Sequence, residues 1–208
     1  MPAKALGEAK GRLADVLTTE ERRQLALAML EDVVSALTAA PSVESVSVVS
    51  PDNEVLSLAA RLGADAIAES ANVVGLNQAL TRALSAMSPP PDALLVVPGD
   101  VPEMTPEDVE ALLAALPPAG IVICPSPDEG TSALALRPAN VITFRFGRKS
   151  LPAHVKEAEK AGLTVNVVRI ASLSRDVDEP EQLRELLERA PDTATYRALR
   201  EMGIEERV

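Results

Sequence analysis

The amino-acid sequence predicts an α/β fold in which a mostly parallel sheet is flanked by helices on both faces. Short apolar runs alternate with amphipathic stretches along all 208 residues. Hydrophobic residues make up 47% of the chain, which is enough to build a sizeable core. Neither an internal repeat nor a linker divides the chain, so we expect residues 1–208 to form a single domain.

The first half of the chain is expected to alternate helix and strand. Thr18 and Glu21 have the spacing of a capping box, and apolar residues follow them at helical spacing. The β-branched residues at 43–49 indicate a strand. The other elements expected here are a helix at 52–62, a short strand at 64–68 and a helix at 75–87.

The second half is expected to supply the centre of the sheet. Residues 93–97 are uniformly apolar, as buried parallel strands tend to be. Thr105 and Pro106 are typical first residues of a helix. Strands at 120–124 and 131–137 are separated by a short loop, which favours antiparallel pairing. The chain should then form a helix at 150–161, a strand at 164–170 and a helix at 179–189.

Charge and aromatic content exclude several classes of partner. The net charge is −11 and no basic face stands out, so we expect neither nucleic-acid nor membrane binding. Aromatic residues make up only 1% of the chain, which leaves Phe144, Phe146 and Tyr196 as platforms on which a base could stack. Nothing resembles a signal peptide or a membrane span, so a cytoplasmic location is expected.

The single cysteine and the single histidine offer little chemistry of their own. Cys124 lies in an apolar run, which favours a buried small hydrophobe over a reactive thiol. A catalytic triad or a Cys/His pair would have to use His154, and no nucleophile motif accompanies it. We therefore expect His154 to lie on the surface of its helix.

Three aspartates follow predicted strands. Asp100 lies just past the strand at 93–97, and ligands of open α/β sheets bind beyond the carboxyl ends of strands. Asp176 and Asp178 are two residues apart, so on an extended segment they point the same way. Each motif alone can also be an ordinary turn or helix cap. Together they predict a site for a divalent cation such as Mg²⁺, because such ions prefer oxygen ligands.

Two further segments are suited to phosphate. Lys4, Lys10 and Arg12 are interspersed with glycines before a helix, and such a segment can hold a triphosphate. Solvated surface charge is an equally good explanation from the sequence alone. Segments 129–132 and 146–150 combine hydroxyls, glycine amides and two cations. Neither the Walker A pattern nor the dinucleotide-binding glycine pattern occurs in the chain.

In this order the motifs resemble those of the guanylyltransferases of deazaflavin coenzyme F-420 biosynthesis. These are the 2-phospho-L-lactate and phosphoenolpyruvate guanylyltransferases. The resemblance extends along nearly the whole chain. It is carried by the segments 2–4, 9–13, 27–32, 75–77, 99–102, 130–131, 146–150 and 176–178.

The resemblance implies a single-domain nucleotidyltransferase fold of the glycosyltransferase-A type. Its substrates would be GTP and a small phosphorylated three-carbon acid. That acid would be 2-phospholactate, phosphoenolpyruvate or 3-phosphoglycerate, which differ by one or two small groups. A homodimer is compatible with the resemblance.

The resemblance also implies roles for individual residues. The metal-binding aspartates of the family fall on Asp100, Asp176 and Asp178, with Mg²⁺ as the fitting ion. Lys10, Arg12 and Asp100 are the residues expected to act in catalysis. The substrate contacts fall on Lys4 in the nucleotide loop, on Gly75 and Asn77 beside the base, and on Thr131, Gly147 and Ser150 at the acceptor phosphate.

The chain departs from the family pattern in three places. Members usually carry an apolar strand before the Pro-x-Lys segment, whereas this chain starts at Met1-Pro2, so the first strand is expected to be missing or very short. The usual Lys-Ser-Arg is Lys-Gly-Arg at 10–12. The usual Thr-Asn-Ala is Thr-Ser-Ala at 131–133, which bears on acceptor specificity.

The expected reaction is attack by an acceptor phosphate oxygen on the α-phosphorus of GTP, with release of pyrophosphate. No protein base is needed because this nucleophile is already anionic. One alternative is another metal-dependent nucleotidyltransferase, of the molybdenum-cofactor or sugar-phosphate type, although the glycine-rich first loop of those enzymes is absent. The other is a non-catalytic nucleotide-binding subunit in which the aspartates only cap helices.

Overall fold

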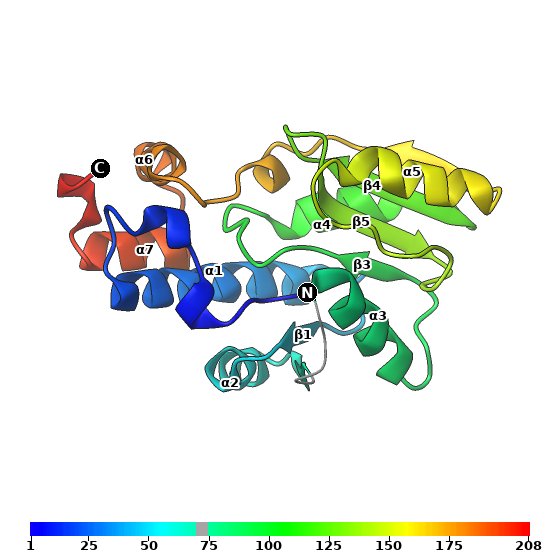
Figure 1. Ribbon diagram of the computed structural model, residues 1–208, viewed down its shortest axis with the longest axis horizontal. Helices are drawn as coiled ribbons and strands as arrows, with labels where there is room; N and C mark the ends of the chain where they lie inside the picture. Colours follow the sequence, from blue (N-terminus) through cyan, green and yellow to red (C-terminus); the bar gives the residue numbers. More distant parts are fainter. Residues whose placement is uncertain (70–74) are drawn as a thin grey trace.

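The computed structural model describes residues 1–69 and 75–208, which form a mixed α/β architecture with two sheets (Figure 1). The strands are β1 (Ser47–Ser50), β2 (Asp65–Ala68), β3 (Leu94–Val96), β4 (Gly120–Pro125), β5 (Thr131–Arg137) and β6 (Thr164–Val167). The α-helices are α1 (Thr19–Ala39), α2 (Asn53–Arg61), α3 (Leu76–Ala86), α4 (Pro106–Ala114), α5 (Ser150–Lys160), α6 (Pro180–Arg189) and α7 (Ala194–Glu201).

The larger sheet has the order β3-β5-β4-β6, and β1 and β2 form a separate parallel pair. β4 and β6 are parallel, whereas β5 is antiparallel to both of its neighbours. The expected antiparallel pairing of β4 with β5 is therefore confirmed. β5 is the reversed strand that makes this sheet mixed; β3 pairs antiparallel with it but runs in the same direction as β4 and β6, as expected. The apolar composition of β3 reflects burial, because a covered strand is apolar whichever way its neighbours run.

Most boundaries agree with the sequence prediction to within one residue, and two strands differ from it by three residues or more at one end. β1 begins at residue 47 instead of 43, and β6 ends at 167 instead of 170. Helix α7 had not been predicted. Within the described residues, no helix is long and apolar enough to cross a membrane.

The first residues form a short extension beside β1. Pro2 makes a parallel bridge with Val49, and the Val49 amide donates to the Met1 carbonyl oxygen at 2.9 Å. A Cβ atom at Gly99 would lie 3.8 Å from the carbonyl oxygen of Pro2, so this segment runs between β1 and the chain that follows β3. Among the described residues, this single bridge stands where the family pattern has its first strand, which had been expected to be missing or very short.

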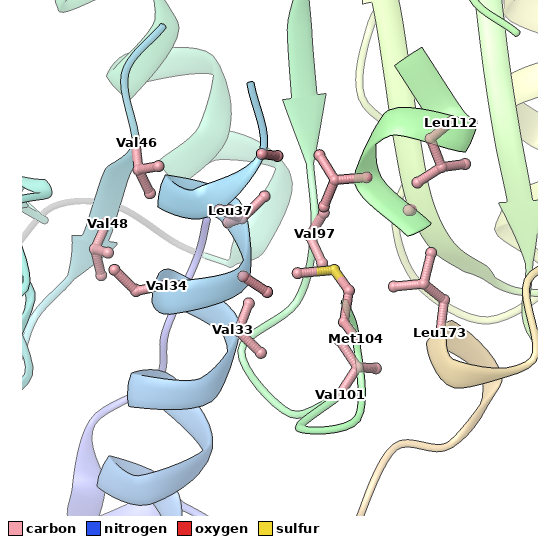
Figure 2. Packing of buried hydrophobic residues seen from close by; sticks show 14 of the residues in the cluster. Val33, Val34, Leu37, Val46, Val48, Val97, Val101, Met104, Leu112 and Leu173 are labelled. Atoms are coloured by element: carbon pink, nitrogen blue, oxygen red, sulfur yellow. The ribbon is translucent and has the colours of Figure 1, made fainter. Parts of the chain in front are cut away.

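Helix α1 supports the main core (Figure 2). The predicted capping box is present, since the Glu21 amide donates to the Thr18 hydroxyl and the Thr18 amide donates to the Glu21 carboxylate. The helix packs between β1 and the chain that follows β3. Figure 2 labels members of this cluster from these elements, from α4 and from the short 3₁₀ helix Ser172–Ser174: Val33, Val34, Leu37, Val46, Val48, Val97, Val101, Met104, Leu112 and Leu173. Burial of Val97 and Val101 therefore fixes the loop that carries Asp100.

A second cluster fixes the other end of the predicted site. Leu13, which ends the short 3₁₀ helix Gly11–Leu13, packs in it together with Val177 and residues of α6 and α7. Helix α7 is held to α1 because Asp32 accepts hydrogen bonds from the amides of Ala194 and Thr195, at 2.7 and 2.8 Å. Val177 is only 1% exposed. Its burial orders the extended segment on which Asp176 and Asp178 lie.

Candidate active site

Most of the predicted site residues line one cavity of about 470 Å³. It lies at the carboxyl ends of β3 and β4, where ligands of such sheets bind. β5 runs antiparallel to β3, so its first residue, Thr131, reaches the same edge. The predicted residues that line the cavity are Arg12, Asp100, Thr131, Gly147, Ser150 and Asp176. A larger hollow of about 1160 Å³, beside residues 137–144, contains none of them.

The two aspartate motifs are joined through backbone and side chains. The Val177 amide donates to the Asp100 carbonyl oxygen at 3.2 Å, which holds the two segments side by side. The Lys10 ammonium lies 3.1 Å from a carboxylate oxygen of Asp100 and 2.6 Å from one of Asp178. Only 7% of the Lys10 side chain is exposed, so this ammonium is a nearly buried counter-charge between two carboxylates.

Asp176 carries the negative charge that Lys10 does not balance directly. Burial raises the pKa of its carboxyl, and repulsion from Asp100 and Asp178 raises it further. Within residues 1–69 and 75–208, no three acidic, histidine or cysteine side chains already form a group that could hold a metal ion. The three carboxylates still sense one another's charge, and their oxygens are the ligands that Mg²⁺ prefers. The donor set therefore fits a divalent cation, provided that Lys10 moves aside.

The other cations of the nucleotide segment lie further out. Arg12 lines the cavity and donates to Glu179 at 2.9 Å, with 72% of its side chain exposed. Lys4 is exposed and does not belong to the cavity lining. The predicted contact between Lys4 and a nucleotide stays a prediction.

Asn77 ties helix α3 to the segment before α5. Its side-chain amide donates to the Phe146 carbonyl oxygen at 2.9 Å and its side-chain oxygen accepts from the Phe146 amide at 2.8 Å. Gly75 precedes the helix with a φ of 85°, a conformation that favours glycine. The Asn77 amide group keeps one hydrogen and one lone pair beyond these two bonds. Recognition of a guanine edge by Asn77 therefore stays a prediction.

The two segments predicted to hold the acceptor phosphate lie together. The Ser150 hydroxyl lies 2.9 Å from the Thr131 hydroxyl, and the Leu151 amide donates to the Glu129 carbonyl oxygen at 3.1 Å. Lys149 pairs with Glu129 at 3.6 Å, with more than half of each side chain exposed. Pro152 has no amide hydrogen and that of Leu151 is occupied. In the described first turn of α5, this leaves only the Ser150 amide as a candidate donor.

The expectation that His154 lies on the surface is wrong. The side chain is 0% exposed and lies behind Thr131, with Nδ1 3.1 Å from the Thr131 hydroxyl oxygen. Nε2 accepts from the Arg145 amide at 2.9 Å, and the ring meets that of Phe146 edge-on, with 4.9 Å between centroids. Burial lowers the pKa of His154 to about 4. The signal for burial was present, because Ser150, His154 and Ala158 are spaced by four and form the buried face of α5.

Cys124 is buried as expected, and burial raises the pKa of its thiol. Phe144 belongs to the core, and Tyr196 packs in the cluster formed by α6 and α7. Phe146 alone of the three aromatic residues lines the cavity, edge-on to His154.

Known proteins are similar to this chain in sequence along most of its length. A family model described as guanylyl transferase CofC like matches residues 1–208. The chain is 42% identical over 193 residues to phosphoenolpyruvate guanylyltransferase of Sphaerobacter thermophilus, with 92% of each chain covered. It is 37% identical over 202 residues to 2-phospho-L-lactate guanylyltransferase of Methanothermobacter thermautotrophicus, with 97% of this chain and 89% of that protein covered.

Solved structures give the same fold at lower sequence identity. A nucleotide-diphospho-sugar transferase from Desulfovibrio desulfuricans matches with a TM-score of 0.75 and 19% identity, covering 99% of this chain and 94% of that one. A nucleotidyl transferase from Methanothermobacter matches with a TM-score of 0.66 and 16% identity, covering 90% and 95%. At these identities the likeness shows the fold, and the predicted nucleotidyltransferase architecture is confirmed.

Proposed function

The chain belongs to the family of CofC-like guanylyl transferases, and we propose that it serves coenzyme F-420 biosynthesis by joining GMP from GTP to a small phosphorylated three-carbon acid. Relatives at 42%, 41% and 39% identity are named phosphoenolpyruvate guanylyltransferase, whereas a relative at 37% is named for 2-phospho-L-lactate. This order favours phosphoenolpyruvate as the acceptor, with 2-phospholactate and 3-phosphoglycerate as the alternatives.

One observation carries the proposal. A single cavity is lined both by Asp100 and Asp176, which carry carboxylates, and by Thr131 and Ser150, which carry hydroxyls. A reaction between two phosphorylated substrates needs such an arrangement, because the nucleotide and the acceptor must meet over one reaction centre. A non-catalytic subunit would need no second phosphate site.

The chemistry requires positioning and charge neutralisation. An acceptor phosphate oxygen forms a bond to the α-phosphorus, and the bond from that phosphorus to the oxygen of the pyrophosphate group breaks. The nucleophile is already an anion and pyrophosphate leaves as one, so no proton has to move. Asp100, Asp176 and Asp178 would hold Mg²⁺, which on binding would neutralise phosphate charge as a Lewis acid.

Lys10 and Arg12 are the cations of this chain proposed for the nucleotide. Lys10 is balanced by Asp100 and Asp178, and Arg12 by Glu179. A triphosphate offers each of them a more highly charged partner than one carboxylate, and charge-assisted hydrogen bonds are the strong ones. Both side chains would then leave their carboxylates when GTP binds.

The test is release of pyrophosphate from GTP in the presence of Mg²⁺ and each of the three acids in turn. We expect release with GTP and one acid, and far less with ATP, CTP or UTP or in the presence of a chelator. A sugar 1-phosphate serves as an additional acceptor. Release only with the sugar phosphate would assign the alternative class of nucleotidyltransferase, and equal rates with ATP would remove the guanine assignment.

A further inference from the structure

His154 is buried behind Thr131, which lines the cavity, and the proposed reaction does not use it. Its Nε2 atom accepts from the backbone amide of Arg145 at 2.9 Å. A backbone amide can only donate, so Nε2 carries no proton. A neutral imidazole carries one proton, which must then lie on Nδ1. With its pKa lowered to about 4 by burial, the ring is neutral near pH 7, and Nδ1–H donates to the Thr131 hydroxyl oxygen at 3.1 Å.

The hydroxyl groups of Thr131 and Ser150 form a hydrogen-bonded pair that keeps one spare proton. The two hydroxyls have two protons, and the hydrogen bond of 2.9 Å between their oxygens uses one of them. Because His154 Nδ1–H donates to the Thr131 oxygen, the imidazole accepts a proton from neither hydroxyl. The pair therefore keeps one hydroxyl proton, whichever of the two donates to the other. Both residues line the cavity, so a ligand there can receive this proton in a hydrogen bond.

The other tautomer would reverse the polarity of this part of the wall. With the proton on Nε2, the ring would face the Arg145 amide donor to donor. Nδ1 would become an acceptor and would take the spare hydroxyl proton. The pair would then present lone pairs to the cavity, and these repel an anion.

Neighbouring residues hold the amide that selects the tautomer. Arg145 precedes Phe146, whose amide and carbonyl are both bonded to the Asn77 side chain. The Phe146 ring packs edge-on against the imidazole at an interplanar angle of 73°. The backbone donor and the ring are therefore fixed relative to each other.

We propose that His154 is a positioning residue that makes the Thr131–Ser150 hydroxyl pair a hydrogen-bond donor to an oxyanion of the acceptor, a phosphate or a carboxylate. The assignment of the oxyanion to the acceptor rests on the proposed function. The proton polarity of the pair rests on the hydrogen bonds alone.

The tautomer can be measured without any substrate. The chain contains a single histidine, so ¹⁵N-labelled, untagged protein gives one set of imidazole signals in a long-range ¹H–¹⁵N correlation spectrum. We expect the Nδ1–H tautomer at pH 7 and no titration of the ring between pH 8 and about 5. An Nε2–H tautomer, or a ring that titrates near its ordinary pKa, would overturn the proposal even if the enzyme is active.

Two variants separate positioning from packing. His154→Gln can place an oxygen near the position of Nε2 and keep the bond to Arg145, but it has no donor at the position of Nδ1. His154→Asn can place an amide N–H at the position of Nδ1. For His154→Gln we expect the KM of the acceptor to rise by about tenfold to a hundredfold, since the lost bond is to a charged group. The KM of GTP should change by less than about twofold.

The outcomes of this comparison are distinct. Partial recovery of the acceptor KM in His154→Asn supports a donor at Nδ1. Equal increases of both KM values in His154→Gln would show that His154 only packs in the core, and would overturn the proposal. If the native protein transfers GMP to none of the acids, the proposed function fails while the tautomer measurement still decides the polarity of the hydroxyl pair.

Discussion

Replacing Lys10 with methionine removes the charge that lies between the aspartates while keeping most of the side-chain stem. The Lys10 ammonium contacts carboxylate oxygens of Asp100 and Asp178 at 3.1 and 2.6 Å. Without it, these two groups and Asp176 repel one another, and no other cation among the described residues forms an ion pair with Asp100 or Asp178. The variant should therefore unfold more easily than the native protein when divalent cations are absent.

The size of the loss follows from the exposure of the partners. Removing one partner of a fully buried ion pair costs about 3–5 kcal/mol, whereas an exposed pair contributes about 0–1 kcal/mol. The Lys10 side chain is 7% exposed, but those of Asp100 and Asp178 are 31% and 40% exposed. We therefore expect a loss of about 2 kcal/mol, between the two limits. For a chain of this size that lowers the Tm by about 4–8 °C.

The assay is thermal unfolding followed by circular dichroism, in chelator and again in millimolar Mg²⁺. A divalent cation supplies positive charge to the same carboxylates, so Mg²⁺ should raise the Tm of Lys10→Met more than that of the native protein. Arg12→Met is the matched control, because Arg12 pairs with Glu179 at the surface, with 72% and 55% of the side chains exposed. It should lower the unfolding free energy by no more than about 1 kcal/mol and leave the response to Mg²⁺ unchanged.

Two results would refute this reasoning. If Lys10→Met melts together with the native protein in chelator, the aspartates need no counter-charge. If Mg²⁺ stabilises both proteins equally, the ion and the Lys10 ammonium do not share these carboxylates.

Three further predictions concern Asp100, Thr131 and His154. Asp100→Asn should abolish pyrophosphate release while the circular dichroism spectrum stays native; a variant that keeps full activity would remove Asp100 from the proposed metal site. Thr131→Val should raise the KM of the acceptor by about tenfold to a hundredfold, because it deletes a hydrogen bond to a charged group. Saturation curves for both substrates check this, and a parallel rise for GTP would assign Thr131 to the support of the fold. The pKa of His154 is lowered from 6.5 to about 4, so its contribution to stability is complete above pH 6.5 and is lost as the pH falls toward 4. Denaturant unfolding across this range should show a loss of up to about 3 kcal/mol that is missing in His154→Gln; identical pH profiles would contradict it.

Helices were predictable from the sequence because their signals are local. The capping boxes at Thr18 and Thr105 set the starts of α1 and α4 from residues within one turn. The antiparallel pairing of β4 and β5 was predictable for the same reason, since a short loop connects them. The pairing of β3 with β5 was not, because β5 lies more than 30 residues further along the chain. Helix α7 was missed because it has only 8 residues and its anchor, Asp32, lies on α1.

The carboxylate site was easier to predict than the hydroxyl site. Asp100 and the Asp176 segment follow strands, and strand ends of an open sheet meet at one edge. The segments of Thr131 and Ser150 were assigned to phosphate by their composition. The role proposed for His154 could be recognised only from the tertiary structure. Its tautomer is selected by the backbone amide of Arg145, and a backbone contact leaves no pattern in the sequence. A single histidine without a nucleophile motif usually has no role in catalysis or binding, whereas the hydrogen bonds of His154 support a proposed positioning role.

The charges around the cavity explain how a chain with a net charge of −11 can accept two polyanions. Arg12 in the cavity wall is already paired with Glu179, and of the cations beside the cavity, Lys10 is paired with Asp100 and Asp178, and Lys149 with Glu129. Phosphate binding at Lys10 is then an exchange of anionic partners. The exchange would leave the aspartates without their cation, and the proposed divalent ion would restore the balance. Binding of the triphosphate and binding of the ion would then be coupled, and by linkage each would strengthen the other by the same factor.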